Sequence, residues 1–377
     1  MARARVEGAN WVSNWNGFVG ALDGCLQALG DARHPDDLMG LSGFAFRINV
    51  HPELSPASLY LFDWHYRFSR VFDRLGYLFS LHYAEKSDLL FGARQKNAMD
   101  VVVRNIDAEK PLVAWNLGVP EFFVVSGYDI TDLDLVASGP PTAGDEDRFP
   151  ISRWGTSGPE NLALIEFGER FQVDPAESAA RALREAVRHA REHEHRVPEH
   201  RNGLAAYDVW ARAVRSGAAE PNAAAYCAHS LAHARSAAAR FLRRALDLFP
   251  SDRREALAEA ATRYGEVAER LRAVADAFPF PPPGGSDRNG SRRRPAADNI
   301  AAAARSEAQG VAALERAFAK PATPSRAGAP RSAGSRRSPA SALAPRKAAS
   351  SGAARSRAKT TKKVASGSAA GRGRRRH

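Results

Sequence analysis

The chain has 377 residues, which is long for a single hydrophobic core and favours two domains or a domain with tails. Its first residues are polar and charged, and no apolar run approaches the roughly 20 residues of a membrane helix, so we expect neither a secretory signal nor a membrane span. The formal net charge is +12 at pH 7, and the two cysteines, Cys25 and Cys227, are too few for a disulfide framework. A cytoplasmic protein is therefore expected.

Residues 1–157 show the mixed apolar pattern of an α+β domain. We predict a helix over residues 17–29, where apolar side chains recur every three or four positions, with Asn16 as its capping residue and Gly30 as its stop. A second helix is predicted over residues 58–75. Strands are predicted at residues 77–81, 112–115, 122–125 and 133–136, separated by Gly, Pro and Asp.

From about Gly158 the pattern becomes helical, and residues 158–319 are predicted to form an α-helical domain. Three apolar stripes follow one another, and each is narrow and rich in alanine, as is typical of helices packed closely in a bundle. The stripes cover residues 231–249, 257–278 and 300–318.

Glu307 falls on the last of these stripes, at a position where an apolar side chain is expected. A buried carboxylate needs a partner, which an Arg or Tyr of the bundle would supply. A structural ion pair is the favoured interpretation, and contact with a ligand is the alternative.

The positive charge of the chain gathers at its C-terminal end. Residues 320–377 hold five Lys and eleven Arg and no Asp or Glu, whereas residues 1–319 carry a formal charge of −4. Without Phe, Trp or Tyr, this end cannot bury enough apolar area to offset its chain entropy, so a disordered tail is predicted. The clustered basic residues predicted to bind polyanions are Arg336, Arg337, Lys362, Lys363, Arg374, Arg375 and Arg376.

The tail resembles the basic arms of linker-histone-like proteins. Such arms neutralise phosphates without reading base sequence, so the resemblance implies non-specific binding of DNA or RNA and a nucleoid-associated location. A solubilising extension is the alternative.

Three stretches carry a further resemblance. They are NWNGFVGALDGCLQALG at residues 14–30, DDLMGLSGFAFR at 36–47 and PLVAWNLGVPEFFVVSGYD at 111–129. Together with GLAAYDVWARAV at 203–214, they make residues 8–319 similar to the family related to the N-terminal domain of butirosin biosynthesis protein H. That family is distantly similar to papain-like and C39-type cysteine peptidases.

The resemblance implies a papain-like fold, in which a Cys at a helix N-terminus attacks an acyl group and a His on a later strand acts as base. The implied reaction is acyl transfer from a carrier protein to an amine, with a small-molecule or acyl-carrier substrate and no cofactor. The arrangement is chemically sound, because the helix N-terminus lowers the thiol pKa and the His completes its activation.

The sequence departs from this pattern at both catalytic positions. Asn16 stands where the nucleophile aligns, and Glu121 stands where the base aligns. Cys25 lies more than two turns into the helix on its apolar stripe, where core packing is the favoured interpretation. Asp129 is a candidate for orienting a base, although Gly-Tyr-Asp after a strand is also an ordinary turn. These four residues are the candidate cleft residues.

The segment from His189 to His193 matches the H-x-x-E-H zinc pattern, with Glu192 between the two histidines. At 100° per residue, however, both histidines point away from the apolar face of the predicted helix, and a solvated, charged helix is the favoured interpretation. No metal site is expected.

Two functions remain open. The first is a relative of the butirosin biosynthesis protein H family, of acyltransferase or amidase lineage, with a degenerate or rebuilt active site. The second is a non-enzymatic protein that associates with nucleic acid through its tail. Whether the chain is an enzyme, and its oligomeric state, stay open at this point.

Overall fold

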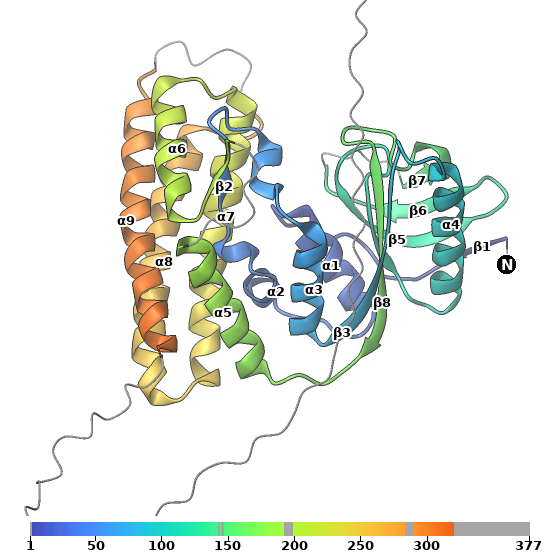
Figure 1. The fold of residues 1–377 in the computed structure, drawn as a ribbon, viewed down its shortest axis with the longest axis horizontal. Coiled ribbons are helices and arrows are strands. Elements are labelled where there is room, and N and C mark those ends of the chain that lie inside the picture. Colours follow the sequence, from blue (N-terminus) through green and yellow to red (C-terminus); the bar gives the residue numbers. More distant parts are fainter. Residues whose placement is uncertain (1, 142–143, 145–146, 192–198, 283–289, 320–377) are drawn as a thin grey trace, which may run out of the picture. The chain divides into compact units, whose positions relative to one another are not determined.

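The computed structural model describes residues 2–141, 144, 147–191, 199–282 and 290–319 (Figure 1). Residues 1–321 form one compact unit of mixed helix and sheet, in agreement with the predicted α+β class. The predicted basic tail, with all the residues predicted to bind polyanions, lies outside the described residues.

An antiparallel sheet organises the N-terminal half of this unit. Its strands follow the order β3-β8-β4-β5-β6-β7, and β1 pairs with β5. Each of the four predicted strands is present, and β4 has the predicted bounds. The strands are β1 (Arg3–Arg5), β3 (Tyr77–Glu85), β4 (Leu112–Trp115), β5 (Phe122–Asp129), β6 (Asp134–Ser138), β7 (Arg148–Pro150) and β8 (Asn161–Arg170).

The prediction of helix from Gly158 onward is wrong for β8. This strand pairs with β3 on one side and β4 on the other, so it lies inside the sheet and completes it. Leu162, Ala163, Leu164 and Ile165 are all buried, because both faces of a central strand are covered. The alternation of apolar and polar residues that usually indicates a strand is therefore missing. The sheet thus takes strands from both sides of residue 157, where the domain boundary was predicted.

Helices cover both faces of the sheet. In Figure 1, α4 (Phe91–Asp107) lies on one side of the strands, while α1 (Gly17–Ala28) and α3 (Trp64–Leu75) lie on the other. The predicted boundaries of α1 are confirmed, since Asn16 caps the helix and the turn at Gly30 follows it. The predicted helix over residues 58–75 is instead split into a 3-10 turn, η2 (Pro56–Tyr60), and α3, which ends at Gly76 with φ at 81°.

The C-terminal half is helical, as predicted. Helices α6 to α9 pack side by side and α5 runs along them (Figure 1). Two short strands, β2 (Asn49–Val50) and β9 (Arg201–Asn202), pair beside the bundle. The three predicted stripes fall on α7, α8 and α9. The helices are α2 (Pro35–Ser42), α5 (Pro175–Arg191), α6 (Leu204–Ser216), α7 (Pro221–Ala245), α8 (Ser251–Ala277) and α9 (Arg293–Phe318), with 3-10 turns at η1 (Phe44–Phe46), η4 (Ile151–Arg153) and η5 (Leu246–Leu248).

A buried ion pair joins the bundle to the N-terminal half. The Arg235 side chain donates from Nε and Nη2 to the two oxygens of Glu307, at 2.7 and 2.9 Å, and both side chains are fully buried. Tyr207 donates a further hydrogen bond to Glu307. Arg235 also donates to the carbonyls of Ala45 and Arg47, in and beside η1. The structural ion pair predicted for Glu307 is confirmed.

Candidate functional site

The candidate site is built around the N-terminus of α1. The side chain of Asn16 accepts a hydrogen bond of 3.0 Å from the Val19 N–H, so it caps the helix. Glu121 precedes β5, the strand that lies against α1. A Cβ atom placed on Gly17 would lie 2.9 Å from Glu121 Oε2, so the carboxylate packs directly against the first residue of the helix. The two positions expected to carry the catalytic pair are therefore neighbours.

Asp129 does not belong to this site. It ends β5, whereas Glu121 precedes the same strand, and the eight residue steps between them span about 26 Å at 3.3 Å per residue. Its carboxylate accepts hydrogen bonds from Arg148 and from the Thr131 N–H, both at 3.0 Å, and these bonds lower its pKa. The assignment of Asp129 to the cleft is wrong. The interpretation of Gly-Tyr-Asp as a turn is wrong as well, because these three residues are the last of β5 and pair with β6.

Neither cysteine is placed for nucleophilic chemistry. Cys25 faces the core between α1 and the sheet and has no exposed surface, and this burial raises its pKa above the ordinary thiol value. Cys227 is equally buried, and its pKa is raised to about 12. Because the thiolate is the reactive form and both side chains are buried, we expect both thiols to be unreactive in the native protein. The interpretation of Cys25 as a core residue is confirmed.

Helix α7 supplies the opposite wall of the site. Tyr226, His229, Ser230 and His233 stand at positions i, i+3, i+4 and i+7, which share one face of a helix otherwise rich in alanine. The Tyr60 hydroxyl lies 3.2 Å from that of Tyr226 and donates to the Trp15 carbonyl at 3.1 Å. Sequence reasoning missed this polar stripe, although the spacing that would have revealed it is present in the sequence.

Aromatic rings surround these hydroxyl groups. The Trp15 ring stacks on His229 at 5.2 Å, with the two planes 20° apart. Phe280 meets both Trp15 and Tyr226 edge-on, at 5.5 and 5.9 Å between ring centroids. Burial raises the pKa of Tyr226 to about 12, and the neighbouring Glu121 carboxylate adds to this effect. The phenols therefore stay protonated and act as hydrogen-bonding groups at neutral pH.

A small cavity of about 30 Å³ lies between α1 and α7. Trp15, Asn16, Tyr60, Ser230 and His233 are among the side chains that line it. A cavity needs about 10–15 Å³ to hold one water, so this one has room for roughly two waters or a small polar group. Ser230 lies close enough to the Tyr60 and Tyr226 hydroxyls to interact with both, whereas His233 Nε2 has no hydrogen-bond partner among the described residues.

The described side chains of this site are suited to binding a ligand. The amide of Asn16 cannot act as a thiolate, and Glu121 already brings negative charge to the helix N-terminus, where it is stabilised. Ser230 Oγ and His233 Nε2 are not hydrogen-bonded to each other, so they do not form a nucleophile–base pair. The hydroxyl groups, the carboxylate and the aromatic rings can instead recognise a ligand.

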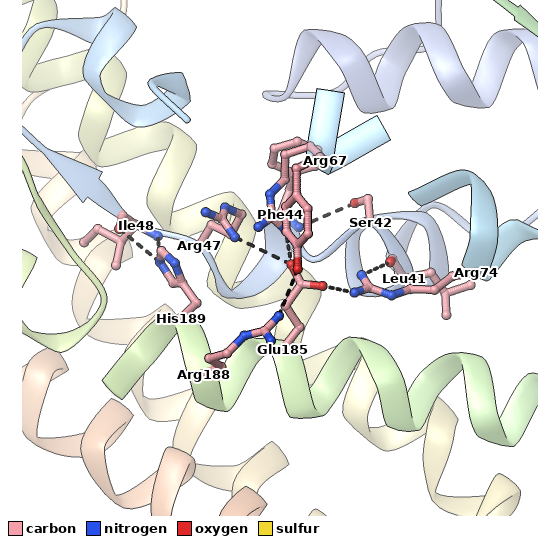
Figure 2. Close-up of polar contacts among 11 residues, drawn as sticks. Leu41, Ser42, Phe44, Arg47, Ile48, Arg67, Arg74, Glu185, Arg188 and His189 are labelled. Atoms are coloured by element: carbon pink, nitrogen blue, oxygen red, sulfur yellow. Dashed lines mark hydrogen bonds and ion pairs between the residues drawn. The ribbon is translucent and has the colours of Figure 1, made fainter. Parts of the chain in front are cut away.

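The H-x-x-E-H segment also differs from its prediction. His189 is buried, and its Nε2 lies 3.1 Å from the backbone N and O of Ile48 (Figure 2). The interpretation of this segment as a solvated helix is wrong here, because α5 lies between α9 on one side and α2 and α3 on the other. Glu192 and His193 lie outside the described residues. Within the described ranges, no three His, Cys, Asp or Glu side chains come together as possible metal ligands.

Glu185, on the same helix, sits at the centre of a buried cluster. Figure 2 shows its carboxylate facing Arg47, Arg67 and Arg74. Arg67 and Arg74 each donate a hydrogen bond to it, and Arg47 Nη1 lies 3.9 Å away. Burial alone would raise the pKa of Glu185, but Arg74 and Arg67 outweigh it, so the pKa lies below its ordinary value. The cluster ties α3 and α5 together.

Compared with models of known protein families and with curated proteins, the sequence matches none of them. Among the helices that the structure describes, none is both long enough and apolar enough to cross a membrane.

Proposed function

We propose that the protein is a relative of the butirosin biosynthesis protein H family with a papain-like fold, whose cleft binds a ligand without thiol catalysis. One observation carries the proposal. Asn16 opens α1 and the Glu121 carboxylate packs against Gly17, so the residues aligned with the nucleophile and the base lie side by side. The two positions are 105 residues apart in the chain, and their proximity is what the resemblance leads us to expect.

The surroundings of this pair support a binding role. The cavity beside Asn16 is lined by hydrogen-bonding groups, and His233 Nε2 there has no hydrogen-bond partner among the described residues. Buried polar groups are normally hydrogen-bonded, so a polar group of a ligand, or water held in its place, is the natural complement. The aromatic rings of Trp15, Tyr226 and Phe280 provide apolar contact next to it.

Restoring the ancestral pair tests the proposal. In the double variant Asn16→Cys/Glu121→His, the new thiol would lie at a helix N-terminus beside an imidazole, and both lower a thiol pKa below its usual value of about 8.5. In Asn16→Cys alone, Glu121 would raise that pKa by charge repulsion. We therefore expect the pH midpoint for alkylation by iodoacetamide to be lower in the double variant than in the single one.

The wild-type protein is the control for this measurement. Its buried Cys25 and Cys227 should not react until the protein is unfolded, so any labelling of the native variants reports on position 16. Equal midpoints in the two variants, or rapid labelling of the wild type, would contradict the proposal.

A second function is favoured by the charge of residues 320–377, which is +16. We propose that this segment binds nucleic acid non-specifically through phosphate contacts. If it neutralises about eight phosphates, the logarithm of the binding constant should fall with the logarithm of salt concentration at a slope of about −7.

Deleting residues 320–377 should abolish retention on double-stranded DNA and remove this salt dependence. Filter binding of the full chain and of residues 1–319, across a series of salt concentrations, measures both quantities. Retention of the truncated chain at full strength would exclude the proposal, because the remaining residues carry a formal charge of −4.

A further inference from the structure

A groove of about 810 Å³ opens away from the α1 site, where the start of α2, the connection from β8 to α5, and the end of α7 meet. Its volume lies within the 300–1,000 Å³ that is usual for small-molecule sites. None of the residues that form the α1 site lines it. The groove is therefore separate from the α1 site.

The charged side chains of the groove are predominantly cationic. Four arginines line it, against two aspartates. Arg74 is paired with the buried Glu185 and Arg244 with Asp37. The excess positive charge therefore comes from Arg33 and Arg170. Asp31 accepts from two guanidinium groups, those of Arg33 and Arg170, each at 2.8 Å. The Asp31 carboxylate thus stands between two guanidinium cations. Arg170 is half-exposed, and its remaining guanidinium N–H groups can donate to a further acceptor. A guanidinium held in position in this way is suited to a planar or tetrahedral anion.

The other walls of the groove are apolar. Phe241 and Leu75 form buried parts of the lining. Phe171 and Leu248 stand at its edge and are unusually exposed for large apolar side chains, at 48% and 41%. The groove therefore offers apolar contact and charge-assisted hydrogen bonds side by side. A ligand with an apolar part and an anionic group would make both kinds of contact.

We propose that this groove binds a small organic anion with an apolar body, its acidic group against Arg170 and Arg33 and its apolar part against Phe171 and Leu248. The basic segment of residues 320–377 is not a suitable occupant, because like charges would meet. The proposal does not depend on the function proposed for the α1 site.

Anilinonaphthalene sulfonate is a suitable probe, because it joins an apolar ring system to a sulfonate and fluoresces when bound. Phenylnaphthylamine has the same rings without the charge. For the full-length protein, we expect Arg170→Gln to weaken binding of the sulfonate about two- to five-fold, as for loss of a partly exposed charge contact. Binding of the neutral dye should not change. Phe171→Ser should weaken both dyes.

Arg181→Gln is the matched control, since Arg181 is as exposed as Arg170 but lies outside the groove. It should leave both affinities unchanged. Every variant keeps residues 320–377, so any sulfonate attracted by that segment contributes equally. Equal effects of Arg170→Gln and Arg181→Gln on the sulfonate, or no effect of Phe171→Ser on either dye, would overturn the proposal.

Discussion

Replacing Glu307 with glutamine is expected to lower the free energy of unfolding by about 3–5 kcal/mol, the range found when one partner of a buried ion pair is removed. Arg235 would keep its charge in a place without exposed surface, while its two strongest hydrogen bonds would lose the carboxylate that accepts them. Tyr207 would lose a charged acceptor as well. Urea denaturation, monitored by tryptophan fluorescence, measures this loss of unfolding free energy.

Glu315→Gln provides the comparison on the same helix. Glu315 binds Arg191 through both oxygens, but the pair is exposed, so its loss should cost no more than about 1 kcal/mol. The double variant Glu307→Leu/Arg235→Met should be more stable than Glu307→Gln, since no uncompensated charge stays buried. Losses of similar size for Glu307→Gln and Glu315→Gln would show that the buried pair has no special role.

The helical half of the fold could be predicted because its signals are local. Apolar residues at helical spacing located α7, α8 and α9, and the chemistry of Asn16 as a cap located α1. Even Glu307 was recognisable, as a charge interrupting an apolar stripe. Strand β8 could not be recognised in the same way, because its alternation is erased by burial on both faces. Helix α4 was also missed, since its run of valines at 101–103 resembles a strand.

The site was predictable only in part, for a related reason. A family pattern could bring Asn16 and Glu121 together, because it carries information about positions distant in the chain. The same pattern wrongly assigned Asp129 to the site, although Asp129 lies at the opposite end of β5 from Glu121. The contribution of α7 depends on how the helical half packs against α1, and no local feature of the sequence specifies that contact.

The Glu185 cluster is a clearer case of long-range order. Its arginines come from residues 47, 67 and 74, more than 100 positions before Glu185, and nothing in the sequence around them points to a shared carboxylate partner. Charged residues are rarely buried unless they are paired, so each is expected at the surface when considered alone. Only the meeting of α3 with α5 makes their burial favourable.

Glu185→Gln is accordingly expected to destabilise the protein by about 3–5 kcal/mol at pH 7. This effect should depend on pH. The folded-state pKa of Glu185 is lowered by Arg74 and Arg67, so its ionised form stabilises the fold fully above the unfolded-state value, about 4.3. That stabilisation is lost as the pH falls through the lower, folded-state pKa. The difference in stability between the wild type and the variant should therefore begin to shrink as the pH falls below about 4, with full convergence only below the folded-state pKa.

Urea denaturation of both proteins between pH 3 and pH 7 measures this convergence. Glu177→Gln is the matched control, because Glu177 lies on the same helix and pairs with Arg181 at the surface. It should cost about 0.5 kcal/mol or less. A constant difference between the wild type and Glu185→Gln over the whole pH range would mean that the ionised carboxylate is not what stabilises the cluster. Because Arg47 joins the cluster and also lines the cavity beside Asn16, loss of Glu185 should also loosen the wall of the α1 site.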